Sequence, residues 1–284
     1  MLAAAPEVAS KVRSIAERRA SEGLSGIGSL TTIEAYPAIR FRHLLHILAP
    51  MPLHLRPSTP YAPDVLLPGD PARALALAQA LLTEPRMSNH ARGLWGYSGE
   101  TDEGRPLSIQ STGMGGPSAA IVLHELAELG VRRAIRVGTC GALDPDLRHG
   151  ELVIAAEALA EDGASRALGA EEVAAADDEL TATLAAQQAT PGPASRIVTT
   201  DLFYEGPGAG ERAEGWRTRG AVAVEMEAAT LFTVGRALGV RTACVLAVSD
   251  TFEDGKRLRI DDEDLTDAAA RMGSLAAAAL RSQP

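Results

Sequence analysis

The sequence predicts an α/β fold, a single domain with a twisted mixed β-sheet flanked by helices. Three observations support this prediction: short apolar runs alternate with helical patterns from Val65 onward, glycine-rich turns accompany two of the apolar runs, and 46% of the 284 residues are hydrophobic. Because strands alternate with helices, we expect a parallel or mixed sheet that helices cover on both faces. Ligands of such sheets bind beyond the carboxyl ends of the strands, so polar residues after the apolar runs are candidates for a site.

The expected elements follow one another in a regular order. Strands are expected at 65–68, 107–112, 134–143, 151–159, 196–199 and 242–248. Helices are expected at 72–82, 118–129, 178–188, 226–238 and 265–280. The glycine turn 113–118 joins a strand to a helix, Gly130 ends that helix, and a second glycine turn lies at 138–141. This order of strand, turn and helix is the repeating unit of α/β proteins.

Residues 1–50 differ in character from the rest and are expected to form an N-terminal extension. Residues 3–20 have the pattern of a short charged helix, 23–29 are rich in Gly and Ser, and the apolar patch 44–48 could dock on the main body. The extension is therefore expected to be partly helical or disordered, and a translation start at Met51 explains it equally well. The domain itself is expected to span 51–284.

Charge and composition exclude several classes of partner. The net charge is −10, from 27 Lys and Arg against 37 Asp and Glu, so the chain as a whole repels nucleic acid and anionic membranes. No apolar run approaches the roughly 20 residues that span a bilayer. Cys140 and Cys244 have no disulfide or metal spacing, which indicates a reducing compartment and favours the cytoplasm. The histidines are dispersed except for a pair in the extension, so we expect no metal site.

Single residues have structural explanations as well as functional ones. The turn 113–118 approaches a dinucleotide-binding pattern, but Ser118 replaces the third glycine and Pro117 lies inside the turn, so that interpretation is weak. Cys140 lacks the spacing of a nucleophile elbow and is more simply a buried thiol. Taken alone, Asp250 after an apolar strand is a cap for a turn or helix.

Six motifs in a fixed order change this interpretation, because together they resemble the nucleoside phosphorylase-I family. They are PGDPARA (68–74), STGMGGPSAA (111–120), IRVGTCGAL (135–143), TTDLFYEG (199–206), VAVEMEAATLF (222–232) and VLAVSD (245–250). The first half is most similar to uridine phosphorylases, and the second to hexameric purine nucleoside and methylthioadenosine phosphorylases. The resemblance implies phosphorolysis of a nucleoside to free base and (deoxy)ribose 1-phosphate, with inorganic phosphate as co-substrate and no cofactor.

The resemblance also implies a role for each matching residue. Phosphate would be bound by Gly69, Arg73, Arg92, Arg136 and Thr139, mainly through guanidinium forks. Ribose would be bound by His54, Met114, Glu225, Met226 and Glu227, and Phe203 would stack on the base. Asp250 would be the catalytic acid that protonates purine N7. In the family an arginine assists that acid, and Arg257 and Arg259 are the candidates here, although their spacing departs from the family pattern.

The base is expected to be a purine rather than uracil. Uridine phosphorylases follow their FY motif with P-G-Q-E-R, whereas this chain has PGAGER at 207–212, without the glutamine. An acid at the position of Asp250 also favours a purine, while the segment EDGAS at 161–165 is typical of the uridine group. Uridine phosphorylase is therefore the alternative. Two further alternatives are a nucleosidase that uses water and a catalytically silent nucleoside-binding protein. Arg73, Arg92 and Arg136, which the resemblance assigns to phosphate, disfavour both.

The resemblance implies a homo-oligomer, because family members complete each site with residues of an adjacent subunit. His54 and Arg92 match those residues. The expected working unit is at least a dimer, and a hexamer built as a trimer of dimers is favoured.

Overall fold

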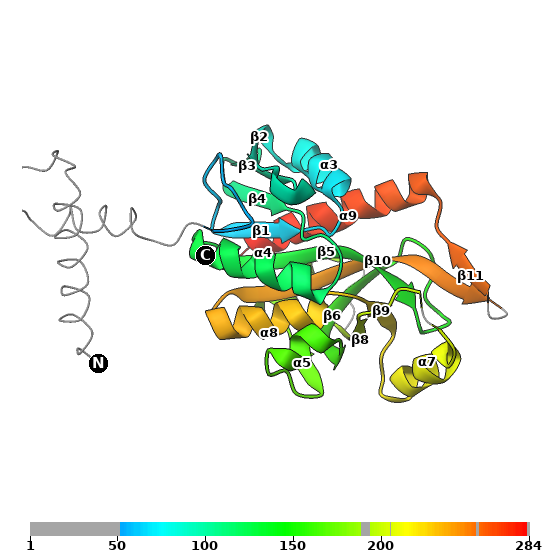
Figure 1. Ribbon diagram of the computed structural model, residues 1–284. Coiled ribbons are helices and arrows are strands. Elements are labelled where there is room, and N and C mark those ends of the chain that lie inside the picture. Colours follow the sequence, from blue (N-terminus) through cyan, green and yellow to red (C-terminus); the bar gives the residue numbers. More distant parts are fainter. Residues whose placement is uncertain (1–51, 189–193, 205, 254–255, 283–284) are drawn as a thin grey trace, which may run out of the picture. The chain divides into compact units, whose positions relative to one another are not determined.

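The computed structural model describes residues 52–188, 194–204, 206–253 and 256–282 (Figure 1). The chain divides into two units, 1–51 and 52–284, and everything described belongs to the second. The helix expected at 3–20 and the apolar patch expected to dock at 44–48 lie outside the described residues.

A mixed sheet forms the centre of the described part. Its strands are β1 (Asp64–Leu67), β2 (Thr83–Asn89), β3 (Gly96–Glu100), β4 (Pro106–Gln110), β5 (Arg133–Ala142), β6 (Leu152–Glu161), β7 (Val173–Ala175), β8 (Ser195–Thr200), β9 (Ala223–Glu225), β10 (Arg241–Glu253) and β11 (Lys256–Arg259). Strands β1, β4, β5 and β10 run parallel where they pair, and β2–β3–β4 is an antiparallel arm. The mixed sheet that the sequence predicts is confirmed.

Part of the sheet closes on itself, which the sequence did not predict. Strand β10 pairs with both β5 and β6, β6 pairs with β8, β8 with β9, and β9 returns to β5. The pairings between β10 and β6 and between β9 and β5 are antiparallel. Five strands therefore form a barrel-like circuit, from which β1, β4, β3 and β2 extend as an open arm.

Helices cover both faces of the sheet (Figure 1). They are α3 (Pro71–Leu81), α4 (Gly116–Glu128), α5 (Gly163–Ala167), α6 (Asp178–Ala186), α7 (Ala209–Thr218), α8 (Ala228–Leu238) and α9 (Asp262–Arg281), with a short 3₁₀ turn η2 (Ala91–Gly93). One layer contains α3, α6 and α9, and the other contains α4, α5 and α8. Local sequence explains where they begin: Asp70 caps α3 and Pro71 follows it, while Asp261 caps α9. None of the described helices has the length and apolar character needed to cross a membrane.

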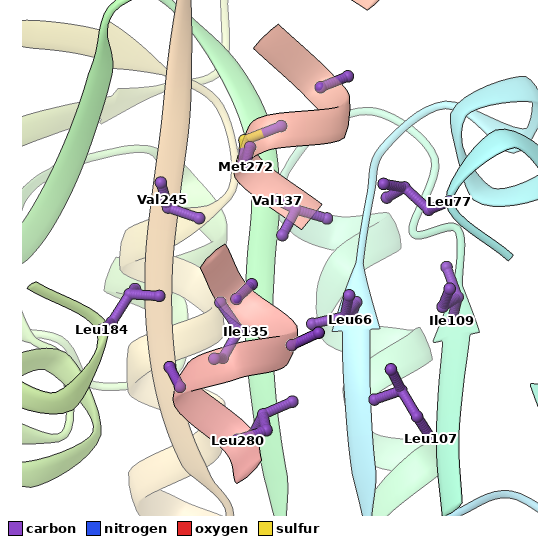
Figure 2. Packing of buried hydrophobic residues seen from close by; sticks show 14 of the residues in the cluster. Leu66, Leu77, Leu107, Ile109, Ile135, Val137, Leu184, Val245, Met272 and Leu280 are labelled. Carbon is purple, nitrogen blue, oxygen red and sulfur yellow. The ribbon is translucent and has the colours of Figure 1, made fainter. Parts of the chain in front are cut away.

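A hydrophobic core lies between α9 and the sheet. Figure 2 shows Ile135 and Val137 of β5 packed between Val245 of β10 and Leu66 of β1, with Met272 of α9 covering them. These side chains are fully or almost fully buried. Each contributes about 1.5–3 kcal/mol of hydrophobic free energy to folding. Strand β5 is therefore a rigid support for the residues that it presents at its carboxyl end.

Three local expectations need correction. The helix expected from 226 begins at Ala228, because Glu225 is the last residue of β9 and Glu227 precedes the helix. The strand expected to end at 248 continues to Glu253 and turns back as β11, so Asp250 lies inside a strand. The hairpin of β2 and β3 was not expected, because β2 is mostly exposed and contains a proline, which is tolerated at a sheet edge.

Candidate active site

One cavity of about 640 Å³ brings together nearly all of the predicted site residues. It is lined by Gly69, Arg73, Arg92, Met114, Arg136, Thr139, Phe203, Glu225, Met226, Glu227 and Asp250, and of the predicted set His54 alone is absent. Gly69 and Met114 follow the ends of β1 and β4 as expected, whereas Arg136, Thr139 and Asp250 lie within β5 and β10. The cavity is therefore lined by residues within two strands of the barrel-like circuit as well as by residues that follow strand ends.

Arg136 is the buried cation of the cavity. Its side chain is 4% exposed, its Nε donates to Glu225 Oε2 at 2.8 Å, and its Nη2 forms an ion pair with Glu227. Burial works against its charge, but Glu227 and Glu225 raise its pKa above the ordinary arginine value. Its Nη1 is buried and has no hydrogen-bond partner within the described residues. A Cβ on Gly138 would lie 2.7 Å from the guanidinium, so glycine leaves the room that Arg136 occupies.

Arg73 lies in the first turn of α3 and adds a second cation. Burial is the main cause that lowers its pKa, and the nearby charges of Arg136 and Arg259 lower it further, against the opposing effect of Asp70. Burial and two neighbouring cations thus disfavour the positive charge of Arg73, and Asp70 only partly offsets them. An anion bound between Arg73 and Arg136 would supply the missing compensation.

Two glycine turns approach each other closely beside these cations. The Gly113 amide donates to the Gly69 carbonyl at 3.1 Å, and a Cβ on Gly69 would lie 3.1 Å from the Gly113 carbonyl oxygen. Gly113 has a φ of +73°, which side-chain-bearing residues rarely adopt. These contacts explain why the turns after β1 and β4 carry glycine rather than a larger residue.

The two glutamates around Arg136 are held differently. Glu225 accepts hydrogen bonds from the amides of Glu227 at 2.9 Å and Ala228 at 3.0 Å, and from the Thr199 hydroxyl at 2.5 Å, so it caps α8 while it holds Arg136. Glu227 accepts from the Gly115 amide. Burial is the main cause that raises the pKa of Glu227, while Arg136 lowers it and Glu225 raises it. The carboxylate of Glu225 is thus already engaged by hydrogen bonds from other groups of the protein.

Asp250 also lines the cavity and is 3% exposed. The Ser249 hydroxyl donates to its Oδ2 at 2.7 Å. Its Oδ1 is 3.4 Å from Arg259 Nη1 and 3.7 Å from Arg257 Nε. Both arginines that the sequence named are therefore adjacent to the acid, because antiparallel pairing of β10 and β11 sets Asp250 opposite Arg259. The guanidinium of Arg257 also lies 4.3 Å from the centre of the Phe203 ring, a cation–π contact.

Phe203 and Met114 are exposed apolar side chains of the cavity lining. Phe203 is 42% exposed and meets Tyr204 edge to face, with 5.0 Å between ring centres. Met114 is 87% exposed. A partly exposed aromatic ring with a guanidinium over it can stack on a planar ligand.

His54 and Arg92 take different positions. His54 lies outside the cavity, where its Nδ1 is 2.7 Å from Glu125 Oε1 in α4. Arg92 is exposed, has a φ of +58° and lines the cavity of its own chain. That a neighbouring copy supplies His54 and Arg92 stays a prediction.

Two further side chains, those of Cys140 and Ser249, are buried at or beside the cavity. Burial raises the pKa of the Cys140 thiol, which lines the cavity, and this disfavours a thiolate nucleophile. Ser249 was missed by the sequence analysis, although a hydroxyl directly before a candidate acid is a signal worth following. The described residues contain no cluster of three His, Cys, Asp or Glu that could bind a metal ion.

Comparison with known proteins gives consistent matches. The model of the phosphorylase superfamily matches residues 63–281. A purine nucleoside phosphorylase (DeoD-type) of Geobacillus kaustophilus (strain HTA426) is 36% identical over 211 residues, which cover 72% of this chain and 88% of that protein. Another, of Caldanaerobacter subterraneus subsp. tengcongensis, is 36% identical over 214 residues, covering 72% of this chain and 90% of that protein. Among solved structures, uridine phosphorylase from Vibrio fischeri ES114 has a TM-score of 0.71 at 25% identity, covering 78% of this chain and 93% of that chain.

Proposed function

Because the chain belongs to the phosphorylase superfamily, we propose that it cleaves the N-glycosidic bond of purine nucleosides by phosphorolysis. The products are the free base and (deoxy)ribose 1-phosphate, so the enzyme is a pentosyltransferase. The observation that carries the proposal is that Arg73, Arg136 and Glu227 line one cavity. Cations for an oxyanion and a carboxylate for a sugar are the two requirements of this reaction. The catalytic domain spans 51–284.

The positive charges of Arg136 and Arg73 bind phosphate. Inorganic phosphate accepts from the unpartnered Nη1 of Arg136 and from Arg73, with Thr139 and the backbone at Gly69 around it. Arg92 of a neighbouring copy completes this end of the cavity. One phosphate oxygen attacks the anomeric carbon of the ribose while the bond to the base breaks. The phosphate is a co-substrate, and no cofactor takes part.

The sugar lies between phosphate and base. The ionised Glu227 accepts from the 2′- and 3′-hydroxyls and stabilises the positive charge that develops on the ribose, with Met114 and Met226 packing beside it. Glu225 supports this arrangement by holding Arg136.

The base leaves with a proton from Asp250. The electron pair of the broken bond goes to the base, and Asp250 delivers its proton to purine N7. Arg257 and Arg259 stabilise the carboxylate that remains, which favours transfer as the bond breaks. Phe203, backed by Arg257, stacks on the base.

The position of His54 supports a homo-oligomer. His54 is absent from its own cavity, and the adjacent Leu53 is 78% exposed. A second copy would cover this apolar surface and receive His54 at the 5′ end of its ribose. A trimer of dimers is the arrangement that we favour.

Uridine phosphorolysis is the second candidate, favoured by the fold similarity to the Vibrio fischeri enzyme. A substrate panel separates the candidates: inosine, adenosine, methylthioadenosine and uridine, each with and without phosphate. We expect phosphate-dependent release of purines with little release of uracil. Preferential uracil release would favour the second candidate, release without phosphate would indicate a nucleosidase, and no release at all would indicate a silent nucleoside-binding protein.

A further inference from the structure

Glu125 of α4 holds the segment that carries His54. Its carboxylate accepts from the amides of Leu53 at 3.1 Å, His54 at 3.0 Å and Leu55 at 2.6 Å, and it contacts the His54 ring at Nδ1 over 2.7 Å. Three consecutive amides and one imidazole nitrogen therefore converge on a single side chain. The cavity on the same chain does not include any of these residues.

The hydrogen bonds keep Glu125 ionised. Burial works to raise its pKa, but the bonds from Leu55, His54 and Leu53 together lower it below the ordinary value. An ionised carboxylate only accepts hydrogen bonds, so the neutral His54 ring carries its hydrogen on Nδ1. The other ring nitrogen, Nε2, is then a bare acceptor. Among the described residues Nε2 forms no hydrogen bond, and the side chain of His54 is 29% exposed.

The surroundings of His54 are apolar and open. Leu53 is 78% exposed, and Ile121, one turn before Glu125 on the same face of α4, is 40% exposed. A bare acceptor framed by exposed apolar side chains fits a surface that a second copy of the chain covers.

We propose that Glu125 is a positioning residue that fixes His54 as the Nδ1–H tautomer, so that Nε2 accepts a hydrogen bond from the 5′-hydroxyl of a nucleoside in a second copy's cavity. The proposal rests on the proposed function and names its substrate class, nucleosides with a free 5′-hydroxyl. A 5′-deoxy or 5′-methylthio nucleoside has no such donor and leaves Nε2 unpaired. We expect a preference of about tenfold in kcat/KM for the hydroxyl-bearing substrate, as for the loss of one enclosed hydrogen bond.

The first experiment reads the tautomer without reference to activity. Imidazole ¹⁵N correlation spectra of the full-length protein, recorded at a pH where the ring is neutral, should show the His54 hydrogen on Nδ1. The variant Glu125→Gln has one acceptor oxygen instead of two and should lose this single tautomer. The matched control Glu128→Gln, on the exposed side of the same helix, should keep it. A hydrogen on Nε2 in the unchanged protein would overturn the proposal.

The second experiment compares inosine with 5′-deoxyinosine. In Glu125→Gln we expect kcat/KM for inosine to fall about tenfold while 5′-deoxyinosine is nearly unaffected, and Glu128→Gln should keep the original ratio. His54→Phe retains the amide contacts to Glu125 and should show the same selective loss, which covers the case in which Glu125→Gln does not fold. An equal fall for both substrates would reduce Glu125 to a structural role and overturn the proposal. Inactivity of the unchanged enzyme on both substrates would instead contradict the proposed function, and the spectra would still decide the tautomer.

Discussion

Arg136 donates from Nε to Glu225 over 2.8 Å, and this pair couples a buried cation of the cavity to the start of α8. Glu225 is 4% exposed and also caps the helix through the amides of Glu227 and Ala228. The same carboxylate thereby orients the guanidinium and ends the strand before the helix. The Nη1 of Arg136 is left without a partner among the described residues and is available to phosphate.

Replacement of Arg136 should chiefly damage phosphate use. We expect Arg136→Gln to lower kcat/KM for phosphate by about 10- to 100-fold, the loss of charge-assisted hydrogen bonds worth about 1.5–3 kcal/mol. It leaves two buried carboxylates unpaired, so the free energy of unfolding should also fall by about 3–5 kcal/mol. Arg133→Gln on the same strand, which weakens the ion pair with Asp64 outside the cavity, is the control. An unchanged KM for phosphate in folded Arg136→Gln would refute its assignment.

The effect of replacing Asp250 on the reaction rate should depend on the leaving group. We expect Asp250→Ala to lower kcat/KM for inosine by about 10²- to 10⁴-fold, the usual contribution of a general acid. A nucleoside whose base is already cationic through methylation at N7 needs no proton and should be largely spared. Steady-state rates for both substrates check this, and an equal loss for both would remove Asp250 from the role of proton donor.

The arginines of β11 should have separable effects. Arg257 contacts Phe203, so Arg257→Gln should raise KM for the nucleoside. Arg259 lies close enough to Arg73 to lower its pKa, so it adds positive potential there, and Arg259→Gln should raise KM for phosphate by a few-fold, a modest effect because its side chain is 59% exposed. Initial rates with each substrate varied in turn distinguish them. Identical kinetic changes in both variants would argue against this division.

The raised pKa of Glu227 predicts an acidic limb in the activity profile. In the proposed function ribose hydroxyls donate to the ionised carboxylate of Glu227. Because burial raises the pKa of this carboxyl, kcat/KM should fall on acidification at a higher pH than for an ordinary carboxyl. The ionisation of phosphate also changes with pH, but it affects inosine and 2′,3′-dideoxyinosine equally, so it cancels in the ratio of their rates. That ratio should fall with decreasing pH in the unchanged enzyme and become flat in Glu227→Gln. A pH-independent ratio in the unchanged enzyme would contradict the role of Glu227.

The sequence predicted the main strands and helices because long apolar runs and glycine turns are local signals. It could not predict the barrel-like circuit, which depends on pairing between strands far apart in the chain, such as β9 with β5. The position of Arg259 opposite Asp250 depends on the register of β10 and β11, and the family spacing gave no guide to it. The burial of Glu125 had a usable signal: it falls between Val122 and Leu126 on the apolar face of α4.

The fate of the phosphate distinguishes phosphorolysis from hydrolysis. Inosine and a stoichiometric amount of phosphate, followed by ³¹P NMR, should show the inorganic phosphate signal converted to ribose 1-phosphate, one molecule for each hypoxanthine released. Arg136→Gln should slow this conversion, whereas Arg133→Gln should not. Release of hypoxanthine with free ribose and an unchanged phosphate signal would contradict the account, because the cations of the cavity would then have no oxyanion to bind in the reaction.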